Sequence, residues 1–201
     1  MTDCFQLLAA PRRPWLDPDW LKQQFLDRSA RVHPDKIHAA SEADKAAAAR
    51  AFAELNAAHL CLAEPKTRLL HLLELELGAK PKDIQQIPVQ LADLFAEVAG
   101  QCRHTDGFLA EKARATSPLV QVELFERSQE WLEKLDGLQQ KLDAFNQRLA
   151  AELQALDARW LAVDATTRPA VLAELEDLYR LLGYFNRWNR QLLERKVALM
   201  T

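Results

Sequence analysis

The stretch His33-Pro34-Asp35-Lys36 lies between two segments whose apolar residues follow helical spacing. Before it, Leu21, Phe25 and Val32 fall on one stripe of a helix predicted over residues 17–32. After it, an alanine-rich segment predicts a second helix over residues 41–62. Proline restricts its own φ and the conformation of the residue before it, so we expect a stiff corner at the tip of a helical hairpin.

Positive charge gathers beside this corner. Lys22, Arg28 and Arg31 belong to the preceding helix, and Lys36 belongs to the corner itself. A rigid corner flanked by cations favours docking on an acidic partner surface, and salt would screen that attraction. Arg28 shares the apolar stripe, so we expect its side chain to extend past the core or to pair with an acid such as Glu54. The alternative for these basic residues is an ordinary solvated helix face.

The composition of the whole chain favours helices. Its 201 residues are 49% apolar and 27% charged, which is typical of a soluble globular protein. Only 5 glycines are present, which argues against a sheet-rich fold. The formal net charge of −3 argues against nucleic-acid binding. We find no secretory signal and no apolar stretch long enough to span a membrane, so the expected location is the cytoplasm.

Proline and glycine divide the chain. Asp17-Pro18 and Ser117-Pro118 each place a capping side chain before a proline, as at many helix starts, and Gly78 is a helix-stop signal. We therefore predict a first domain over residues 1–78, a linker over 79–87 and a second domain over 88–201. The first domain is predicted to contain four helices, over residues 4–9, 17–32, 41–62 and 65–77.

The second domain is predicted to be an antiparallel three-helix bundle, which makes the fold class all-α. Alternating spacing of three and four, typical of packed helices, relates Leu124, Ser128, Trp131, Leu135, Leu138, Leu142, Phe145 and Leu149. A last helix repeats the pattern at Val171, Leu175, Leu178, Leu182 and Phe185, and a shorter one has Leu91, Leu94, Phe95 and Val98. The same spacing permits a homodimer.

No residues with a recognised catalytic or metal-binding pattern stand out. The three cysteines are Cys4, Cys61 and Cys102. They are far apart and form no C-x-x-C pair, so we expect neither a zinc site nor a disulfide framework. His33 and Asp35 have no adjacent nucleophile that would complete a triad, and together with His38 they have no recognised metal-ligand spacing. We therefore expect no enzyme, no cofactor and no resident metal.

The corner and its flanks resemble the J-domain family, the co-chaperones of DnaK-type ATPase chaperones. The family pattern also includes a phenylalanine and an asparagine-alanine pair in the third helix, here Phe52 and Asn56-Ala57, followed by Pro65 and Arg68. The resemblance implies docking on a DnaK/HscA-type chaperone and stimulation of its ATP hydrolysis. The residues implied in docking are His33, Pro34, Asp35, Lys36, Arg31, Arg28 and Lys22.

The arrangement of a J-domain followed directly by a helical bundle is similar to the HscB family of iron–sulfur cluster assembly. Residues 3–8, 68–75 and 178–187 resemble that family's opening helix, fourth helix and last bundle helix, with His71 where an aromatic residue is common. The resemblance implies that the bundle holds an iron–sulfur scaffold protein, IscU-like, as its client. The implied contacts are Leu94, Phe95 and Val98, with Tyr184 opposite.

Three alternatives stay open from the sequence. The apolar residues at 94, 95 and 98 could instead belong to the bundle core. The chain could be a J-domain adaptor for a different client. It could also be a helical structural protein with a non-functional J-like hairpin.

Overall fold

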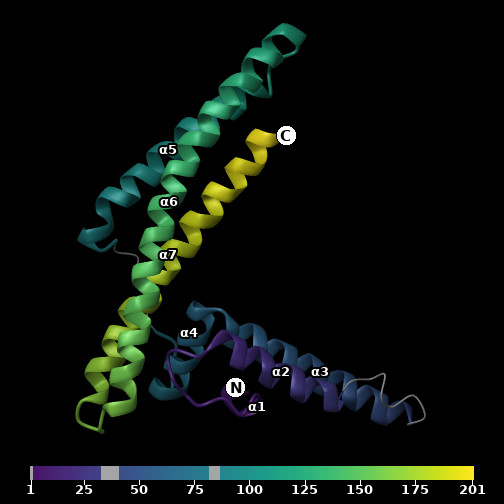
Figure 1. The fold of residues 1–201 in the computed structure, drawn as a ribbon, viewed down its shortest axis with the longest axis vertical. Coiled ribbons are helices and arrows are strands. Elements are labelled where there is room, and N and C mark those ends of the chain that lie inside the picture. Colours follow the sequence, from purple (N-terminus) through teal and green to yellow (C-terminus); the bar gives the residue numbers. More distant parts are fainter. Residues whose placement is uncertain (1, 33–40, 82–86) are drawn as a thin grey trace. The chain divides into compact units, whose positions relative to one another are not determined.

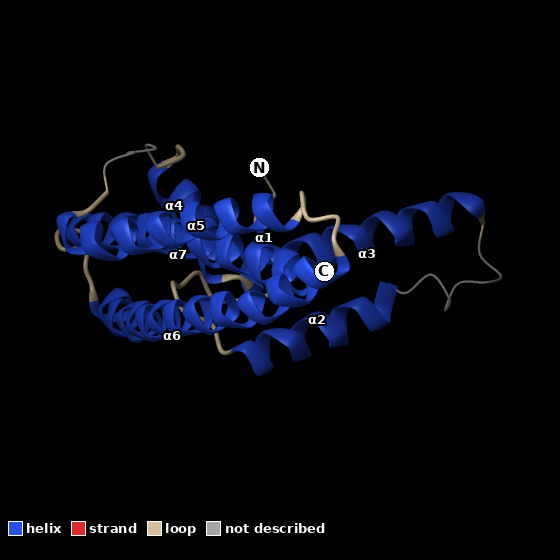
Figure 2. Ribbon diagram, turned by 90° about the horizontal axis from the view of Figure 1, so that it is seen from above, coloured by secondary structure: helices blue, strands red, loops and turns tan. Residues whose placement is uncertain are grey.

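A computed structural model describes residues 2–32, 41–81 and 87–201, and the predicted corner at residues 33–36 and His38 lie outside these ranges. Every regular element in the described ranges is a helix, so the all-α prediction is confirmed (Figures 1 and 2). The first four helices are α1 Cys4–Leu7, α2 Pro18–Val32, α3 Glu42–Ala63 and α4 Pro65–Leu77. A 3-10 turn, η2 Val89–Leu91, leads into α5 Ala92–Lys112, α6 Pro118–Ala162 and α7 Arg168–Met200.

The chain forms two compact units. The first comprises residues 1–82 and 151–180, and the second comprises residues 83–150 and 181–201. The limits of the predicted domains, 1–78, 79–87 and 88–201, stay predictions. The two compact units differ from the predicted domains in one respect. The end of α6 and the start of α7 pack with the first unit rather than with the rest of the bundle.

The helix ends follow the local sequence signals. The carboxylate of Asp17 accepts a hydrogen bond from the backbone N–H of Trp20 at 2.8 Å, and this satisfies an N–H of the first turn of α2. The carboxylate of Glu64 accepts from the backbone N–H of Thr67 at 2.6 Å at the start of α4. Gly78 ends α4 with φ of 70°, a left-handed conformation that a side chain would strain.

Helices α2 and α3 lie side by side and form the hairpin that the sequence predicts (Figures 1 and 2). Leu21 of α2 and Leu55 of α3 are buried between the elements of the first unit. Further along, the ring of Phe25 stacks on the ring of His59 with 4.6 Å between centroids. Apolar burial and ring stacking therefore hold the two helices that flank the predicted corner.

Arg68 joins three segments at the base of this hairpin. Its side chain is buried, its Nε donates to the carbonyl oxygen of Pro14 at 2.7 Å, and its Nη1 donates to the carbonyl oxygen of Leu62 at 2.5 Å. Burial lowers the pKa of the Arg68 guanidinium to about 10, which still leaves it charged at neutral pH. The hydrogen bonds of the Arg68 guanidinium thus connect the segment before α2 to the end of α3.

The predicted apolar stripe of α6 is buried at almost every position. In the second unit the buried positions are Leu124, Ser128, Leu135, Leu138, Leu142, Phe145 and Leu149, while Trp131 is half-buried. The stripe of α7 differs from the prediction after Leu182. Phe185 is only half-buried, and Trp188, Leu192 and Leu199 are buried instead, because the buried face shifts around the helix toward the Trp188 ring.

Helix α5 is held against both long helices in the second unit. The ammonium of Lys141 in α6 forms an ion pair with Glu97 of α5. The Nη2 of Arg195 in α7 lies 2.6 Å from a carboxylate oxygen of Asp106 in α5. Among the described residues, no helix is long and apolar enough to cross a membrane.

Candidate functional site

The residues predicted to contact a partner chaperone lie on α2 or just beyond it. Lys22 and Arg31 are exposed on α2, and Arg28 is half-buried. The corner at residues 33–36, which the sequence places at the tip of the hairpin, lies outside the described residues. The described part of this surface therefore consists of two exposed cations on the helix that leads to the corner.

Arg28, which shares the apolar stripe of α2, has a half-buried side chain. Within the described part of the chain its Nε is buried without a hydrogen-bond partner, and it forms no ion pair with the exposed Glu54. The described residues therefore do not show the expected pairing with Glu54, and the other expectation, in which the aliphatic stem covers apolar surface, stays a prediction.

The residues predicted to contact a client fall into two groups. Val98 is 1% exposed and Leu94 is half-buried, so Val98 belongs to the bundle core, as the alternative interpretation of the sequence allowed. Phe95 is 40% exposed and Tyr184 is half-buried. The second pair therefore consists of two aromatic side chains that are at least partly exposed.

Trp188 joins the second pair into one cluster, which we call the aromatic cluster: Phe95, Tyr184 and Trp188. The centroid of the buried Trp188 ring lies 6.4 Å from that of Phe95 and 5.7 Å from that of Tyr184, and both pairs are tilted. The sequence analysis missed Trp188. Its spacing of four from Tyr184, which puts both rings on one face of a helix, could have indicated it.

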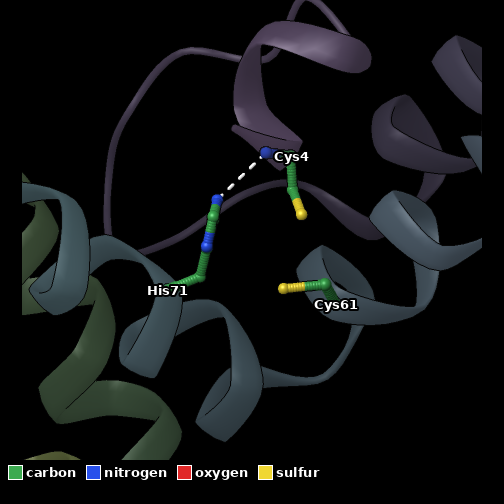
Figure 3. A group of neighbouring side chains, drawn as sticks. All are labelled: Cys4, Cys61 and His71. Carbon is green, nitrogen blue, oxygen red and sulfur yellow. Dashed lines mark hydrogen bonds between the residues drawn. The ribbon is translucent and has the colours of Figure 1, made fainter. Parts of the chain in front are cut away.

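The fold also assembles a group of metal-ligating side chains that the sequence analysis did not expect. One ligand atom from each of Cys4, Cys61 and His71 lies within 4.8 Å of the others (Figure 3). The backbone N–H of Cys4 donates to His71 Nε2 at 3.0 Å. Burial raises the pKa of the Cys61 thiol to about 12, raises the pKa of the Cys4 thiol and lowers the pKa of His71.

Comparison with known sequences finds relatives that carry the name HscB. A scan against models of protein families finds no match. The chain is 27% identical over 151 residues to the co-chaperone protein HscB homolog of Vibrio atlanticus, a match that covers 68% of this chain and 86% of the relative. It is 39% identical over 72 residues to the HscB homolog of Bordetella pertussis, but this match covers only 36% of the chain and 42% of that relative.

Comparison with solved structures agrees in fold. Chaperone HscB from Vibrio cholerae matches with a TM-score of 0.57 and 21% identity, over 94% of this chain and 96% of that one. The human co-chaperone protein HscB matches with a TM-score of 0.64 and 17% identity, over 98% of this chain and 83% of that one. At these identities the likeness establishes the arrangement of the helices. The sequence relatives bear the same name, so the predicted resemblance is confirmed.

Proposed function

Since this chain is HscB-like in sequence and in fold, we propose that it is a co-chaperone in iron–sulfur cluster assembly. In this proposal the first unit docks on a DnaK/HscA-type ATPase chaperone and stimulates its ATP hydrolysis. The bundle holds an IscU-like scaffold protein and brings it to that chaperone. The observation that carries the proposal is the match to a co-chaperone HscB homolog over 86% of that relative's length, together with the His33-Pro34-Asp35 stretch.

Docking through the corner is supported by the contacts that hold α2 and α3, the two helices of the hairpin, together. Arg68 and the stacked Phe25 and His59 rings hold the helix pair in place, so little conformational entropy would be lost when the partner binds. The exposed cations Lys22 and Arg31 would attract an acidic surface and speed its approach. His33 and Asp35 would then make the short-range contacts.

Client binding is assigned to the aromatic cluster. Exposed aromatic rings seated on a buried tryptophan are typical anchors of protein interfaces, since they bury much area with few rotatable bonds. Phe95 supplies the exposed ring, and the buried Trp188 of α7 contacts both Phe95 and Tyr184. Val98 is buried, so we assign it a structural role in the bundle core.

The docking proposal is tested by the steady-state ATPase rate of a DnaK/HscA-type chaperone with and without this chain. We expect the wild type to stimulate the rate and His33→Gln to abolish stimulation. His104→Gln is the matched control, because His104 is an exposed histidine on α5 in the second unit. Circular dichroism and the melting temperature should be alike in all three proteins.

The outcomes separate the alternatives. Equal stimulation by His33→Gln would refute docking through the corner. No stimulation by the wild type would favour a structural protein with a non-functional hairpin. Stimulation without retention of an iron–sulfur scaffold protein in a pull-down would favour an adaptor for a different client.

A further inference from the structure

Three metal-ligating side chains from three helices converge in the first unit (Figure 3). Cys4 is the first residue of α1, Cys61 lies in the last turn of α3, and His71 lies in the middle of α4. Figure 3 shows the two sulfur atoms facing one another, with the His71 ring beside them. Cys4 and His71 are 67 positions apart in the sequence, so only folding brings the group together.

The spacing of the donor atoms is close to what a tetrahedral zinc ion requires. Zinc–sulfur and zinc–nitrogen bonds of about 2.3 and 2.0 Å place neighbouring donor atoms roughly 3.5 to 3.8 Å apart. The three donors of this group already lie within 4.8 Å of one another. Zinc binding would require the most separated of these donors to approach by about 1 Å.

The surroundings of the group also suit a bound cation. The Phe5 ring stacks on the His71 ring with 5.6 Å between centroids and 17° between planes, which holds the imidazole in place. Glu74 follows His71 by three positions on α4, and its negative charge acts on both Cys61 and His71. Its Oε1 is buried and has no hydrogen-bond partner among the described residues; the nearest cation, Lys80 Nζ, is 3.8 Å away. Glu74 is not among the residues whose ligand atoms lie within 4.8 Å of one another, so it supplies negative charge near the group rather than a ligand.

We propose that Cys4, Cys61 and His71 bind a zinc ion, with the fourth position taken by a water molecule. Binding replaces two S–H bonds by two Zn–S bonds and releases both protons to solvent. If the ion binds His71 through Nε2, the lone pair that now accepts from the Cys4 N–H turns to the metal. No oxidation or reduction is involved.

The consequence of such a site is structural. The ion would link α1 to the end of α3 and to α4. Arg68 of α4, which donates to Leu62 at the end of α3, stabilises the same junction. Cys4 and Cys61 are half-buried, so an ion can reach them from solvent, while the buried His71 anchors it from inside. The inference does not depend on the proposed co-chaperone role.

The test is titration of the reduced, metal-free full-length protein with Co²⁺, a spectroscopic substitute for zinc. We expect saturation at a single ion per chain, with thiolate-to-cobalt charge-transfer absorption and the visible bands of tetrahedral cobalt. Zn²⁺ should displace the colour and raise the melting temperature of the wild type. Cys4→Ser and Cys61→Ser should each lose the charge-transfer band and the thermal shift, whereas Cys102→Ser, a buried thiol of the second unit, should keep both.

A second measurement covers the case in which a serine variant fails to fold. In the wild type, Zn²⁺ should slow alkylation of Cys4 and Cys61, measured by mass spectrometry, and leave the alkylation of Cys102 unchanged. Absence of the thiolate band, or equal bands in Cys61→Ser and wild type, would overturn the proposal. Loss of two thiols under oxidised glutathione with no cobalt binding by the reduced protein would also overturn it, in favour of a disulfide.

Discussion

Asp157 of α6 forms an ion pair with Arg13, which lies 144 positions away in the sequence. Both Nε and Nη2 of the guanidinium donate hydrogen bonds to the carboxylate. The Nε of Arg13 lies 2.9 Å from Oδ1, and the backbone N–H of Trp15 donates to the same oxygen at 3.0 Å. Asp157 is 3% exposed. The hydrogen bond from Arg13 is what makes this buried carboxylate tolerable, and the pair fastens the segment between α1 and α2 to α6 within the first unit.

Replacement of this carboxylate should destabilise the first unit. Asp157→Ala leaves the N–H groups of Arg13 and Trp15 without their acceptor, and we expect a loss of about 2 to 3 kcal/mol. The loss stays below that of a fully buried pair because the Arg13 side chain is 27% exposed and can regain water. Urea unfolding followed by circular dichroism measures it. Glu174→Ala, which breaks an exposed pair with Arg159, is the control and should change little.

Arg68 should be more sensitive to substitution than an exposed arginine. Arg68→Met keeps the length of the side chain but leaves the carbonyl oxygens of Pro14 and Leu62 without a donor. The lost charged hydrogen bonds are partly offset by the lower cost of burying methionine, so we expect a net loss of about 2 kcal/mol. Thermal unfolding compared with Arg103→Met, at an exposed position of α5, tests this; equal melting temperatures would contradict it.

The cations of α2 should act on association with the partner chaperone more than on the chemistry that follows. Arg31→Glu should weaken the apparent affinity roughly threefold to tenfold at low salt, because a rim charge acts mainly on the association rate. The difference from wild type should shrink as salt is added. The ATPase rate as a function of co-chaperone concentration measures both effects. Arg103→Glu supplies the matched charge change on α5 of the second unit, and an equal effect there would count against a role for this surface.

Phe95 should matter for client binding and little for stability. Phe95→Ala removes the exposed ring of the aromatic cluster, and we expect scaffold affinity to fall roughly tenfold, equivalent to about 1.4 kcal/mol. Phe125→Ala removes a phenylalanine of α6 that is more exposed than Phe95, and it should leave the affinity unchanged. Calorimetry with an IscU-like protein provides the measurement. If both variants bind like wild type, the client surface lies elsewhere.

The turn between α6 and α7 should make a pH-dependent contribution to stability. Asp164 Oδ1 accepts hydrogen bonds from the N–H of Thr167, the hydroxyl of Thr167 and the N–H of Thr166, which lower the pKa of its carboxyl below the ordinary 3.8. A carboxyl with a lowered folded pKa stabilises the fold above its unfolded pKa, and this contribution disappears as pH falls through the folded pKa.

Melting temperatures over a pH series test this prediction. The gap between wild type and Asp164→Ala should be largest near neutral pH and should close in acid. Asp143→Ala removes a carboxylate that accepts a hydrogen bond from the Gln139 side chain. It should change the melting temperature much less at neutral pH. A gap for Asp164→Ala that is constant over the whole series would refute the stabilising role of the hydrogen bonds from Thr166 and Thr167 to this carboxylate.

Much of the fold could be predicted because its signals are local. The capping Asp17, the Gly78 stop and the three-and-four spacing of α6 each act within a few residues, and each is present in the structure. The buried face of α7 could be predicted only as far as Leu182. Beyond it, the size of the Trp188 ring and its neighbours decided which positions are buried, and spacing alone carries no information about a neighbour's shape.

The candidate surfaces divide in the same way. Phe95 and Tyr184 could be named from the resemblance to HscB, but the separation of an exposed Phe95 from a core Val98 required the packing of the bundle. The corner at residues 33–36 lies outside the described residues, so its role stays a prediction from sequence and resemblance.

The amino-acid sequence by itself determined where helices begin and end and which of their faces are apolar, because caps, proline and side-chain periodicity act over one or two turns. The tertiary structure alone decided which distant groups became partners. The pairing of Arg13 with Asp157 and the meeting of Cys4, Cys61 and His71 depend on chain segments brought together by burial of apolar side chains. No spacing along the sequence encodes such a meeting, because it is the collapse of the helices that selects it.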